Sequence, residues 1–432
     1  MDILIFEDDF YRRLVPLALT RHLSDIYISG LTNLERIKVI LDYMKLGDYD
    51  IWLSGRKYLS EYIIHDLYVN YLSELSDISS KYVIGINSLI LCTMNNLRLL
   101  IEKILQVKNT VWIKNGRIVA FNISKETLEH ICKSTDVANM IINEEFLSSL
   151  KKSGVEVLNV NIKILSNPWD IINILDAILK DDIMFFYNLY KEDFREVKRN
   201  VFVHKNAVLG DVVIFNSEPI LIEDGVVIND LVTITGPAWI KKDAKLLSNA
   251  KVSCSVIGVV SKFGAEMDTA ILDNYSNMAH AGFLGHSYVG RWVNIGALTA
   301  FSDLKNTYGN VKMCVNGLLT DSGMIKLGSF VSDFSKLSIG THIYSGKWIG
   351  VSSLVHGLVN IDIPSFTIWT GKSLIELNIS KAIDMQKRMF SRRGICQKQY
   401  HIKLLSKIFE LTKEERMKLN AIKKRVEWSD FI

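Results

Sequence analysis

One stretch of this chain repeats with a period of six residues, and this period restricts the fold more than any other feature of the sequence. Between residues 327 and 366 an aliphatic or small residue recurs every six positions, and an apolar row follows four residues behind it. The first row is Leu327, Asp333, Ile339, Ser345, Val351, Gly357 and Ile363, and the second is Val331, Leu337, Ile343, Ile349, Val355 and Ile361. An α-helix repeats every 3.6 residues and a strand every 2, so neither explains this pattern.

A period of six is typical of a solenoid in which each hexapeptide forms one short strand and a tight corner. Three hexapeptides complete a triangular coil, and we expect both rows to point inward and to stack on neighbouring coils. The sequence therefore predicts a left-handed parallel β-helix. The same period begins near Val203, and we expect two interruptions, 258–283 and 302–326, to be loops.

The hexapeptide region lies between two segments of different pattern. Residues 1–195 alternate strand candidates such as Ile3–Phe6 with helical patterns, which predicts an α/β domain. Residues 201–370 carry the β-helix. Residues 371–432 form a helical tail that we expect to cover the open end of the solenoid rather than to take part in catalysis.

Local signals refine this outline. Residues 58–75 have a helical pattern, and Asn115-Gly116 lies between two strand candidates as a hairpin turn. Pro168 is expected in the first turn of a helix. Thr412 and Glu415 have the spacing of a capping box for the last helix.

Composition excludes several classes of protein. The chain has 51 Lys and Arg against 47 Asp and Glu, and the small net charge of +4 does not indicate a nucleic-acid partner. The five cysteines are isolated, which favours neither a zinc site nor disulfides and fits a reducing compartment. No apolar run reaches the roughly 18 residues of a membrane span, and no basic signal-peptide segment begins the chain. We expect a cytoplasmic protein without a membrane partner.

The segment 274–303 differs from the regular repeats because it contains two histidines, His280 and His286. Small residues flank His280 and leave its ring uncrowded. An imidazole is well suited to accept a proton from an amine near neutral pH. The residues alone favour a structural histidine at either position over a catalytic one.

Residues 274–287, NYSNMAHAGFLGHS, resemble a GYSNKAHDGFLGDS-like motif, and Val293–Ala297 and Ser302–Asn306 follow in the same register. This motif is found in a divergent sugar nucleotidyltransferase branch of the bifunctional N-acetylglucosamine-1-phosphate uridylyltransferase/glucosamine-1-phosphate acetyltransferase family. The resemblance implies that His280 is the base that deprotonates a sugar amine before the amine attacks the thioester of acetyl-CoA.

The same resemblance implies roles for five further residues of the β-helix region. Phe283 and Asn294 would contact the sugar, and Lys312 would be a loop lysine near the site. Ala297 and Asp303 would lie on the cofactor side, Asp303 standing where the family has Asn. A departure from the family lies at Asp268, where many relatives have a phosphate-binding lysine, because a carboxylate would repel a phosphate.

The N-terminal region resembles the same branch more weakly. The segment from Arg13 to Arg21 is similar to the phosphate-binding loop of sugar-phosphate nucleotidyltransferases, which implies that Arg13 and Arg21 bind phosphate and that Asp8 and Asp9 bind Mg²⁺. Glu7–Phe10 replaces the glycine-rich part, which normally wraps phosphates with backbone N–H groups. A domain that has lost nucleotidyl transfer is as well supported as an active one.

Two functions follow from the resemblance. The first is a transferase of nucleotide-sugar biosynthesis, of the kind that makes UDP-N-acetylglucosamine. It would transfer acetyl from acetyl-CoA to an amino-sugar-1-phosphate, and a nucleotidyl group from an NTP to a sugar-1-phosphate. Such enzymes are homotrimers with active sites between subunits. The alternative is a non-catalytic sugar-phosphate- or nucleotide-binding regulator or scaffold on a degenerate enzyme fold, supported by Asp268, Phe283 and Asp303.

Overall fold

The computed structural model describes residues 1–432 except 134–135, 217–218, 425–426, 428–429 and 432. The chain divides into two compact units, the first formed by Met1–Leu14 and Arg21–Pro168 and the second by Val15–Thr20 and Trp169–Ile432. Helix α6 (Trp169–Tyr190) falls in the second unit, whereas the sequence-based boundary at 195 assigns it to the first. The reason is that α6 packs against strands of the β-helix.

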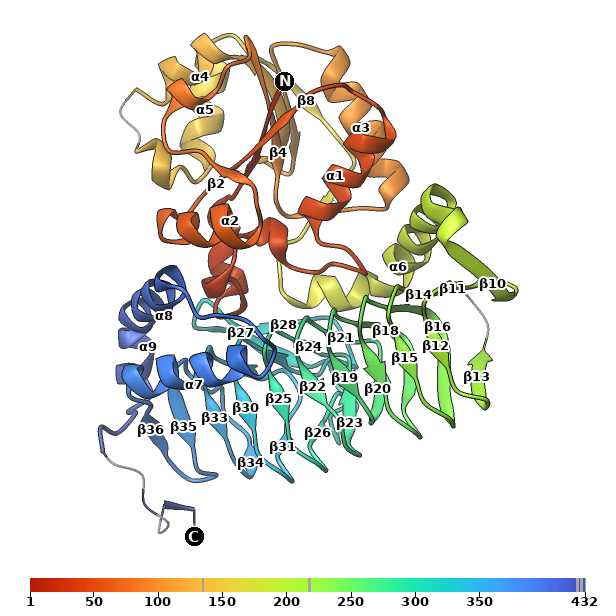
Figure 1. Ribbon diagram of the computed structural model, residues 1–432. Helices are drawn as coiled ribbons and strands as arrows, with labels where there is room; N and C mark the ends of the chain where they lie inside the picture. The colour runs from red at the N-terminus through yellow and green to blue at the C-terminus, as the bar shows by residue number, and fades with distance from the viewer. Residues whose placement is uncertain (134–135, 217–218, 425–426, 428–429, 432) are drawn as a thin grey trace. The chain divides into compact units, whose positions relative to one another are not determined.

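The first unit is an α/β domain built on one seven-stranded sheet (Figure 1). Its strand order is β3-β2-β1-β4-β7-β6-β8, with β7 antiparallel to both of its neighbours. The strands are β1 (Asp2–Phe6), β2 (Asp50–Ser54), β3 (Asn70–Tyr71), β4 (Tyr82–Asn87), β6 (Thr110–Lys114), β7 (Arg117–Ser124) and β8 (Glu156–Asn159), with a separate pair β5 (Ile90–Leu91) and β9 (Lys163–Ile164).

Helices cover both faces of this sheet. They are α1 (Asn33–Tyr43), α2 (Ser60–Asp66), α3 (Met94–Gln106), α4 (Lys125–Ile131) and α5 (Glu144–Lys152). The Asn115-Gly116 turn is confirmed, with φ values of 50° and 78°. The helix predicted over 58–75 is too long, because the chain leaves α2 at Asp66 and pairs Asn70 and Tyr71 with β2.

The second unit is a left-handed parallel β-helix, as the hexapeptide period predicts (Figure 1). Its strands form three faces. Face 1 contains β13 (Val213–Asn216), the first halves of β16 (Val232–Ile240) and β18 (Lys251–Ile257), β20 (Glu266–Asp268), β23 (Phe283–Gly285), β26 (Ala300–Phe301), β31 (His342–Ile343) and β34 (Leu358–Val359). Face 2 contains β11 (Val201–His204), β14 (Ile220–Ile222), the second halves of β16 and β18, β21 (Ile271–Leu272), β24 (Tyr288–Val289), β29 (Phe330–Val331) and β32 (Trp348–Ile349), and β10 (Phe194–Lys198) joins β11 in antiparallel fashion. Face 3 contains β12 (Val208–Leu209), β15 (Val227–Ile228), β17 (Lys245–Leu246), β19 (Lys262–Phe263), β22 (Asn277–Met278), β25 (Asn294–Ile295), β30 (Lys336–Leu337), β33 (Leu354–Val355), β35 (Thr367–Trp369) and β36 (Leu374–Glu376).

Of the two predicted rows, the apolar one fills the interior from Val331 to Val355, but its last member, Ile361, is 36% exposed. In the apolar row, five residues from Val331 to Val355 are at most 3% exposed, as predicted. The prediction that the other row also points inward is wrong at Ile339, which is 71% exposed because it lies on a corner. The second inward position is a small buried residue two before most of the apolar ones, such as Ser335 before Leu337, because alternate residues of a strand point to the same side.

Of the two predicted interruptions, one is wrong and one is confirmed. The stretch 258–283 continues the β-helix through β19 to β22. One coil there, from Lys262 to Asn277, is shorter than the coil before it, from Lys245 to Lys262, so the hexapeptide spacing is lost while the coil is kept. The stretch 302–326 does leave the coil and forms the hairpin of β27 (Lys312–Val315) and β28 (Leu318–Asp321).

The tail consists of α7 (Ile379–Ser391), α8 (Gln399–Leu411) and α9 (Lys413–Lys418). Figure 1 shows α7 lying along face 3 of the β-helix, so the tail covers more than the open end. The predicted capping box is wrong, because the Thr412 hydroxyl donates to the Ile408 carbonyl at 2.8 Å instead of capping α9. Of the helices in the described part of the chain, none is long and apolar enough to cross a bilayer.

The inward rows predict that two leucines of neighbouring coils differ strongly in how much they stabilise the fold. Leu284 is 0% exposed and Leu298 is 60% exposed. We expect Leu284→Ala to lower the free energy of unfolding by about 2–5 kcal/mol, because it leaves a cavity in the coil. Leu298→Ala is expected to change it by about 0.5 kcal/mol or less. Urea unfolding measures both, and equal effects would contradict the assigned register.

Candidate functional site

His280 lies at the corner between β22 and β23, and its side chain is exposed. Ala297 occupies the same corner one coil further on, where the Leu298 N–H donates to the Ala281 carbonyl at 2.6 Å. The chains approach so closely that a Cβ on Gly282 would lie 2.4 Å from the Thr299 carbonyl oxygen. Two of the residues expected to act in acetyl transfer are thus stacked at one corner.

The second histidine of the motif forms a side-chain pair that the sequence reasoning did not foresee. His286 Nδ1 lies 2.7 Å from Asp303 Oδ2, and the two side chains are only 13% and 11% exposed. A carboxylate bound to one ring nitrogen fixes the orientation of the ring, and it leaves Nε2 as the proton acceptor when the ring is neutral. The carboxylate of Asp303, which was expected on the cofactor side, is therefore already bound to His286.

The positive φ of His286 is a property of the corner and not a sign of function. His286 has φ 42°, and Thr269 and Cys254, which follow face 1 strands in the preceding coils, have φ values of 51° and 46°. The pair with Asp303, however, depends on a local feature. A Cβ on Gly285 would lie 2.5 Å from Asp303 Oδ2 and 2.7 Å from the Phe283 ring, so only glycine lets both groups approach.

The predicted residues of the β-helix separate into two groups along the edges of face 1. His280 and Ala297 lie at the edge shared with face 3. Phe283 turns its ring over Gly285, toward the edge shared with face 2, where His286 and Asp303 lie. Lys312 is exposed on β27, in the hairpin that follows Asp303 along the chain. The structure does not bring the two groups together within one chain.

Asn294 lines a hollow of about 540 Å³ between face 3 and the tail, beside the corner that holds His280. The resemblance implies that Asn294 contacts the sugar, whereas the tail was expected only to cover the open end of the solenoid. Other residues that line the hollow are Lys262, Asn277, Ala279, Lys336, Arg392 and Arg393.

In the first unit, the residues expected to bind phosphate make internal contacts. Arg13 Nε donates to the Ser166 carbonyl at 2.7 Å, and its guanidinium also contacts Asn167 Oδ1. Arg21 is 0% exposed, and its carbonyl accepts a hydrogen bond from Arg56 at 2.8 Å.

The two carboxylates expected to bind Mg²⁺ differ in their surroundings. Asp8 Oδ2 accepts from Arg117 at 2.7 Å and from Asn87 at 3.0 Å, so its charge is already paired and the side chain does not fit the ion. Asp9 is exposed at the start of a short 3₁₀ helix. Within the described residues, no group of three or more His, Cys, Asp or Glu side chains is arranged to hold a metal ion.

Glu7, in the segment that replaces the glycine-rich loop, is the centre of a buried ion pair. Arg56 Nη2 lies 2.6 Å from Glu7 Oε1, and the Leu23 N–H donates to the same carboxylate at 2.9 Å. Burial alone would raise the pKa of the Glu7 carboxyl, but the charge of Arg56 and these hydrogen bonds outweigh it and lower the pKa to about 2. A buried carboxylate thus lies where relatives have a loop that can wrap phosphates.

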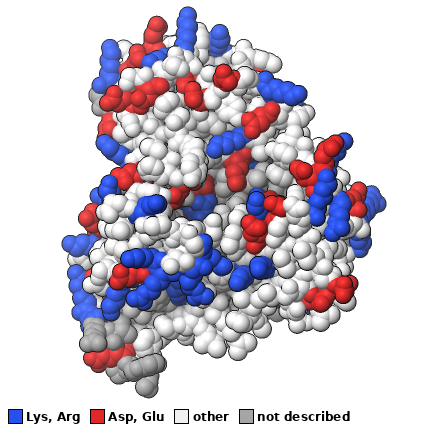
Figure 2. All heavy atoms as spheres, in the orientation of Figure 1, with Lys and Arg blue, Asp and Glu red and all other residues white. Residues whose placement is uncertain are grey.

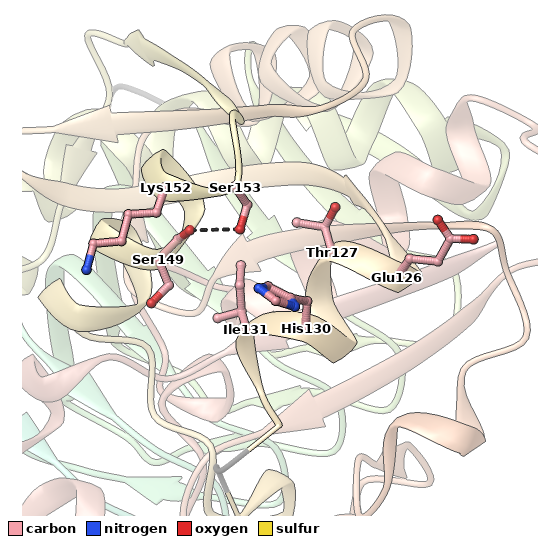
Figure 3. Close-up of a pocket in the computed structure, with 7 residues that line it drawn as sticks. All are labelled: Glu126, Thr127, His130, Ile131, Ser149, Lys152 and Ser153. Carbon is pink, nitrogen blue, oxygen red and sulfur yellow. Dashed lines mark hydrogen bonds between the residues drawn. The ribbon is translucent and has the colours of Figure 1, made fainter.

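A second hollow, of about 440 Å³, lies in the first unit between α4 and α5 (Figure 3). Figure 3 shows the charged ends of Glu126 and Lys152 pointing in opposite directions, and the hydrogen bond drawn there, from the Ser153 hydroxyl to the Ser149 carbonyl, is internal to the end of α5. Because its polar side chains do not converge and no predicted site residue lines it, this hollow is not a candidate site.

The Glu7 pair predicts a specific pH dependence of stability. We expect Glu7→Gln to lower the free energy of unfolding by about 3–5 kcal/mol near neutral pH, because it leaves the buried Arg56 charge without a partner. The pKa of Glu7 is lowered from 4.5 to about 2, so its stabilisation is present above pH 4.5 and is lost as the pH falls toward 2. The difference between wild type and variant should shrink over that range.

Urea unfolding of the first unit between pH 7 and pH 3 measures this difference. The matched control is Glu102→Gln, because Glu102 forms an ion pair with Arg98 that is about one-third exposed. Its effect should be about 0.5 kcal/mol or less over the whole range. A pH-independent cost of Glu7→Gln would contradict the low pKa.

Solved structures with similar folds are acyltransferases that act on sugar nucleotides. UDP-N-acetylglucosamine acyltransferase of Francisella novicida is 14% identical, with a TM-score of 0.25, over 52% of this chain and 88% of that one. UDP-N-acetylglucosamine O-acyltransferase of Moraxella catarrhalis RH4 is 12% identical, with a TM-score of 0.25, over 50% and 94% of the two chains. The β-helix itself is established by its own strand register.

Sequence comparisons give two further similarities. A curated relative, the bifunctional sugar-1-phosphate nucleotidylyltransferase/acetyltransferase of Sulfurisphaera tokodaii, is 26% identical over 208 residues. The matched part is 46% of this chain and 46% of the relative, so the chain matches about half the length of that protein. Residues 3–188 match the model of the family described as sugar nucleotidyl transferase. This match covers the first unit and most of α6, so that part of the chain is similar to sugar nucleotidyl transferases.

Proposed function

We propose that this chain is a two-domain transferase of nucleotide-sugar biosynthesis. The first unit transfers a nucleotidyl group from an NTP to a sugar-1-phosphate and releases pyrophosphate. The β-helix transfers acetyl from acetyl-CoA to the amino group of an amino-sugar-1-phosphate, and UDP-N-acetylglucosamine is the kind of product expected. The observation that carries the proposal is the combination of a sugar nucleotidyl transferase domain with an exposed histidine at one corner of a β-helix.

In the acetyl transfer, His280 acts as the general base. The amine nitrogen forms a bond to the thioester carbonyl carbon while a proton passes from the amine to the imidazole. The carbon–sulfur bond then breaks, and the CoA thiolate takes up the proton. Exposure of His280 supports this role, because the base must reach the bound amine. The His286–Asp303 pair is a second candidate for the base, because its ring is already oriented.

The positions of these groups support an assembly of three copies. His280 lies at one edge of face 1, and Lys312, Asp303 and His286 lie at the other. A closed ring of copies sets one edge of each subunit against a different surface of the next. We therefore propose a cytoplasmic homotrimer in which each acetyl-transfer site combines His280 of one subunit with the opposite edge of its neighbour.

Nucleotidyl transfer normally uses Mg²⁺, which is bound through one or two carboxylates and the phosphates of the substrate. Asp8 is paired with Arg117 and does not fit this role, which leaves Asp9 as the carboxylate for the ion. Arg13 would bind phosphate only after exchanging its present side-chain contacts, and the side chain of Arg21 would first have to leave its buried position. The internal contacts of Arg13 and Asp8 would also fit the alternative, a non-catalytic binding protein, but the similarity to transferases does not support it.

The two histidines can be separated by mutation. With acetyl-CoA and glucosamine-1-phosphate, His280→Ala should lower kcat for thiol release by about 10²–10⁴-fold, because the proton acceptor is lost. His286→Ala should cost less if the pair only orients neighbouring groups. A large loss of activity in His286→Ala, with normal turnover in His280→Ala, would identify His286 as the general base instead of His280.

A separate assay tests the first unit. Each of the four NTPs is supplied with glucose-1-phosphate or N-acetylglucosamine-1-phosphate, and pyrophosphate release is followed. We expect release with at least one pair, abolished by EDTA because the triphosphate needs Mg²⁺. Absence of both pyrophosphate and thiol release, with sugar phosphate still bound, would favour the non-catalytic alternative.

A further inference from the structure

The hollow between face 3 and α7 contains a row of polar side chains in register. Lys262 pairs with Asn277, Asn277 with Asn294, and Asn294 with Lys336, on four successive strands of face 3. Strands of one sheet lie about 4.8 Å apart, so the two lysines are roughly 14 Å apart with two amides between them. All four side chains line the hollow.

The C-terminal end of α7 contributes two more cationic side chains to the same hollow. Arg392 and Arg393 both line the hollow, and Arg393 Nη2 donates to Asn277 Oδ1 at 3.0 Å. The end of the helix is held by Phe390, whose buried ring lies 4.7 Å from the Trp292 ring. Figure 2 shows Lys and Arg side chains gathered over α7 and the adjoining strands.

The hollow contains four cationic side chains and no acidic one. Its lining includes Lys262, Lys336, Arg392 and Arg393, and no Asp or Glu. In the part of the chain that the structure describes, none of the four forms an ion pair with a carboxylate. Like charges held together in this way are unfavourable unless an anion lies between them. The partial negative charge at the C-terminal end of α7 stabilises the two arginines there. It does not explain the two lysines, which belong to the β-helix.

Burial disfavours the charge of Lys336. Its Nζ donates to the Trp292 carbonyl at 2.6 Å, and burial lowers the pKa of its ammonium group to about 7. A lysine in such surroundings regains its full charge when an anion binds beside it. One wall of the hollow is formed by Tyr275 and Trp292, whose rings stack with their centroids 4.4 Å apart. This wall offers a flat apolar surface beside the cations.

We propose that this hollow binds an organic phosphate, with the phosphate group between the lysines and arginines and the ring that carries it against Asn277, Asn294 and the aromatic wall. The substrate class rests on the proposed function, because two of its substrates have this chemistry. One is an amino-sugar-1-phosphate, and the other is the 3′-phosphorylated adenosine end of CoA. Ala279 lines the hollow immediately before His280, so the ligand lies beside the proposed site of acetyl transfer.

Isothermal titration of the full chain tests this site without requiring turnover. The probes are glucosamine-1-phosphate against glucosamine, and CoA against 3′-dephospho-CoA. In at least one pair, the phosphorylated member should bind about ten-fold or more tightly than the other. The pair that shows the difference identifies the source of the phosphate.

Variants then place the binding in this hollow. Lys262→Gln and Arg393→Gln, which change two different elements, should each weaken binding of the phosphorylated probe about ten-fold. The matched control is Lys245→Gln, because Lys245 is the next lysine of the same row but does not line the hollow. It should bind as the wild type does. Unchanged melting temperatures confirm that the variants are folded.

Three results would overturn the inference: no phosphorylated probe binds at millimolar concentration, both members of each pair bind equally, or Lys262→Gln and Arg393→Gln bind like the wild type. The proposed function is judged separately by thiol release. If the variants keep both acetyl transfer and phosphate binding, the phosphate site is wrong and the proposed function stands. If phosphate binds here but no acetyl transfer occurs, the proposed reaction is wrong and the phosphate site stands.

Discussion

The β-helix depends on hydroxyl groups that satisfy the backbone at its corners. Most strands pair only two or three residues, so the turns between strands leave buried N–H and C=O groups that need partners. Ser335 donates to the Gly350 carbonyl at 2.6 Å and accepts from the Ser353 N–H at 3.2 Å, which links two successive coils. Ser276 connects its neighbours in the same way. These small inward residues and the apolar row together hold the coils in register.

This register decides which functional groups meet. His286 and Asp303 are 17 residues apart, as are Asn277 and Asn294, which pair across adjacent strands. Seventeen residues therefore complete one coil in this part of the chain, and His280 and Ala297 have the same separation. A rigid solenoid brings together only residues on stacked coils, so groups at opposite edges of face 1 can meet only through a second subunit. The tail adds Arg392 and Arg393 to the hollow beside face 3.

The sequence was sufficient for the architecture but not for the site. The hexapeptide period identified the β-helix, and the apolar row from Val331 to Val355 is buried as expected. The period could not identify the inward serines, because small polar residues also occur at exposed corners. The His286–Asp303 pair had a signal that was not used: the family motif has Asp and Asn at these two positions, and both are changed together. The hollow under α7 could not be foreseen, because its charges come from strands and a helix that are far apart in the sequence.

The central claim is that each acetyl-transfer site is shared between two copies of the chain. The most direct measurement is acetyl transfer by mixed assemblies of His280→Ala and Asp303→Ala subunits, co-expressed in equal amounts, when each variant alone is inactive. If each site combines opposite edges of neighbouring subunits, about a quarter of the sites in random trimers contain two intact edges, and that share of activity should return. If the mixture stays as inactive as the single variants, the shared site is contradicted.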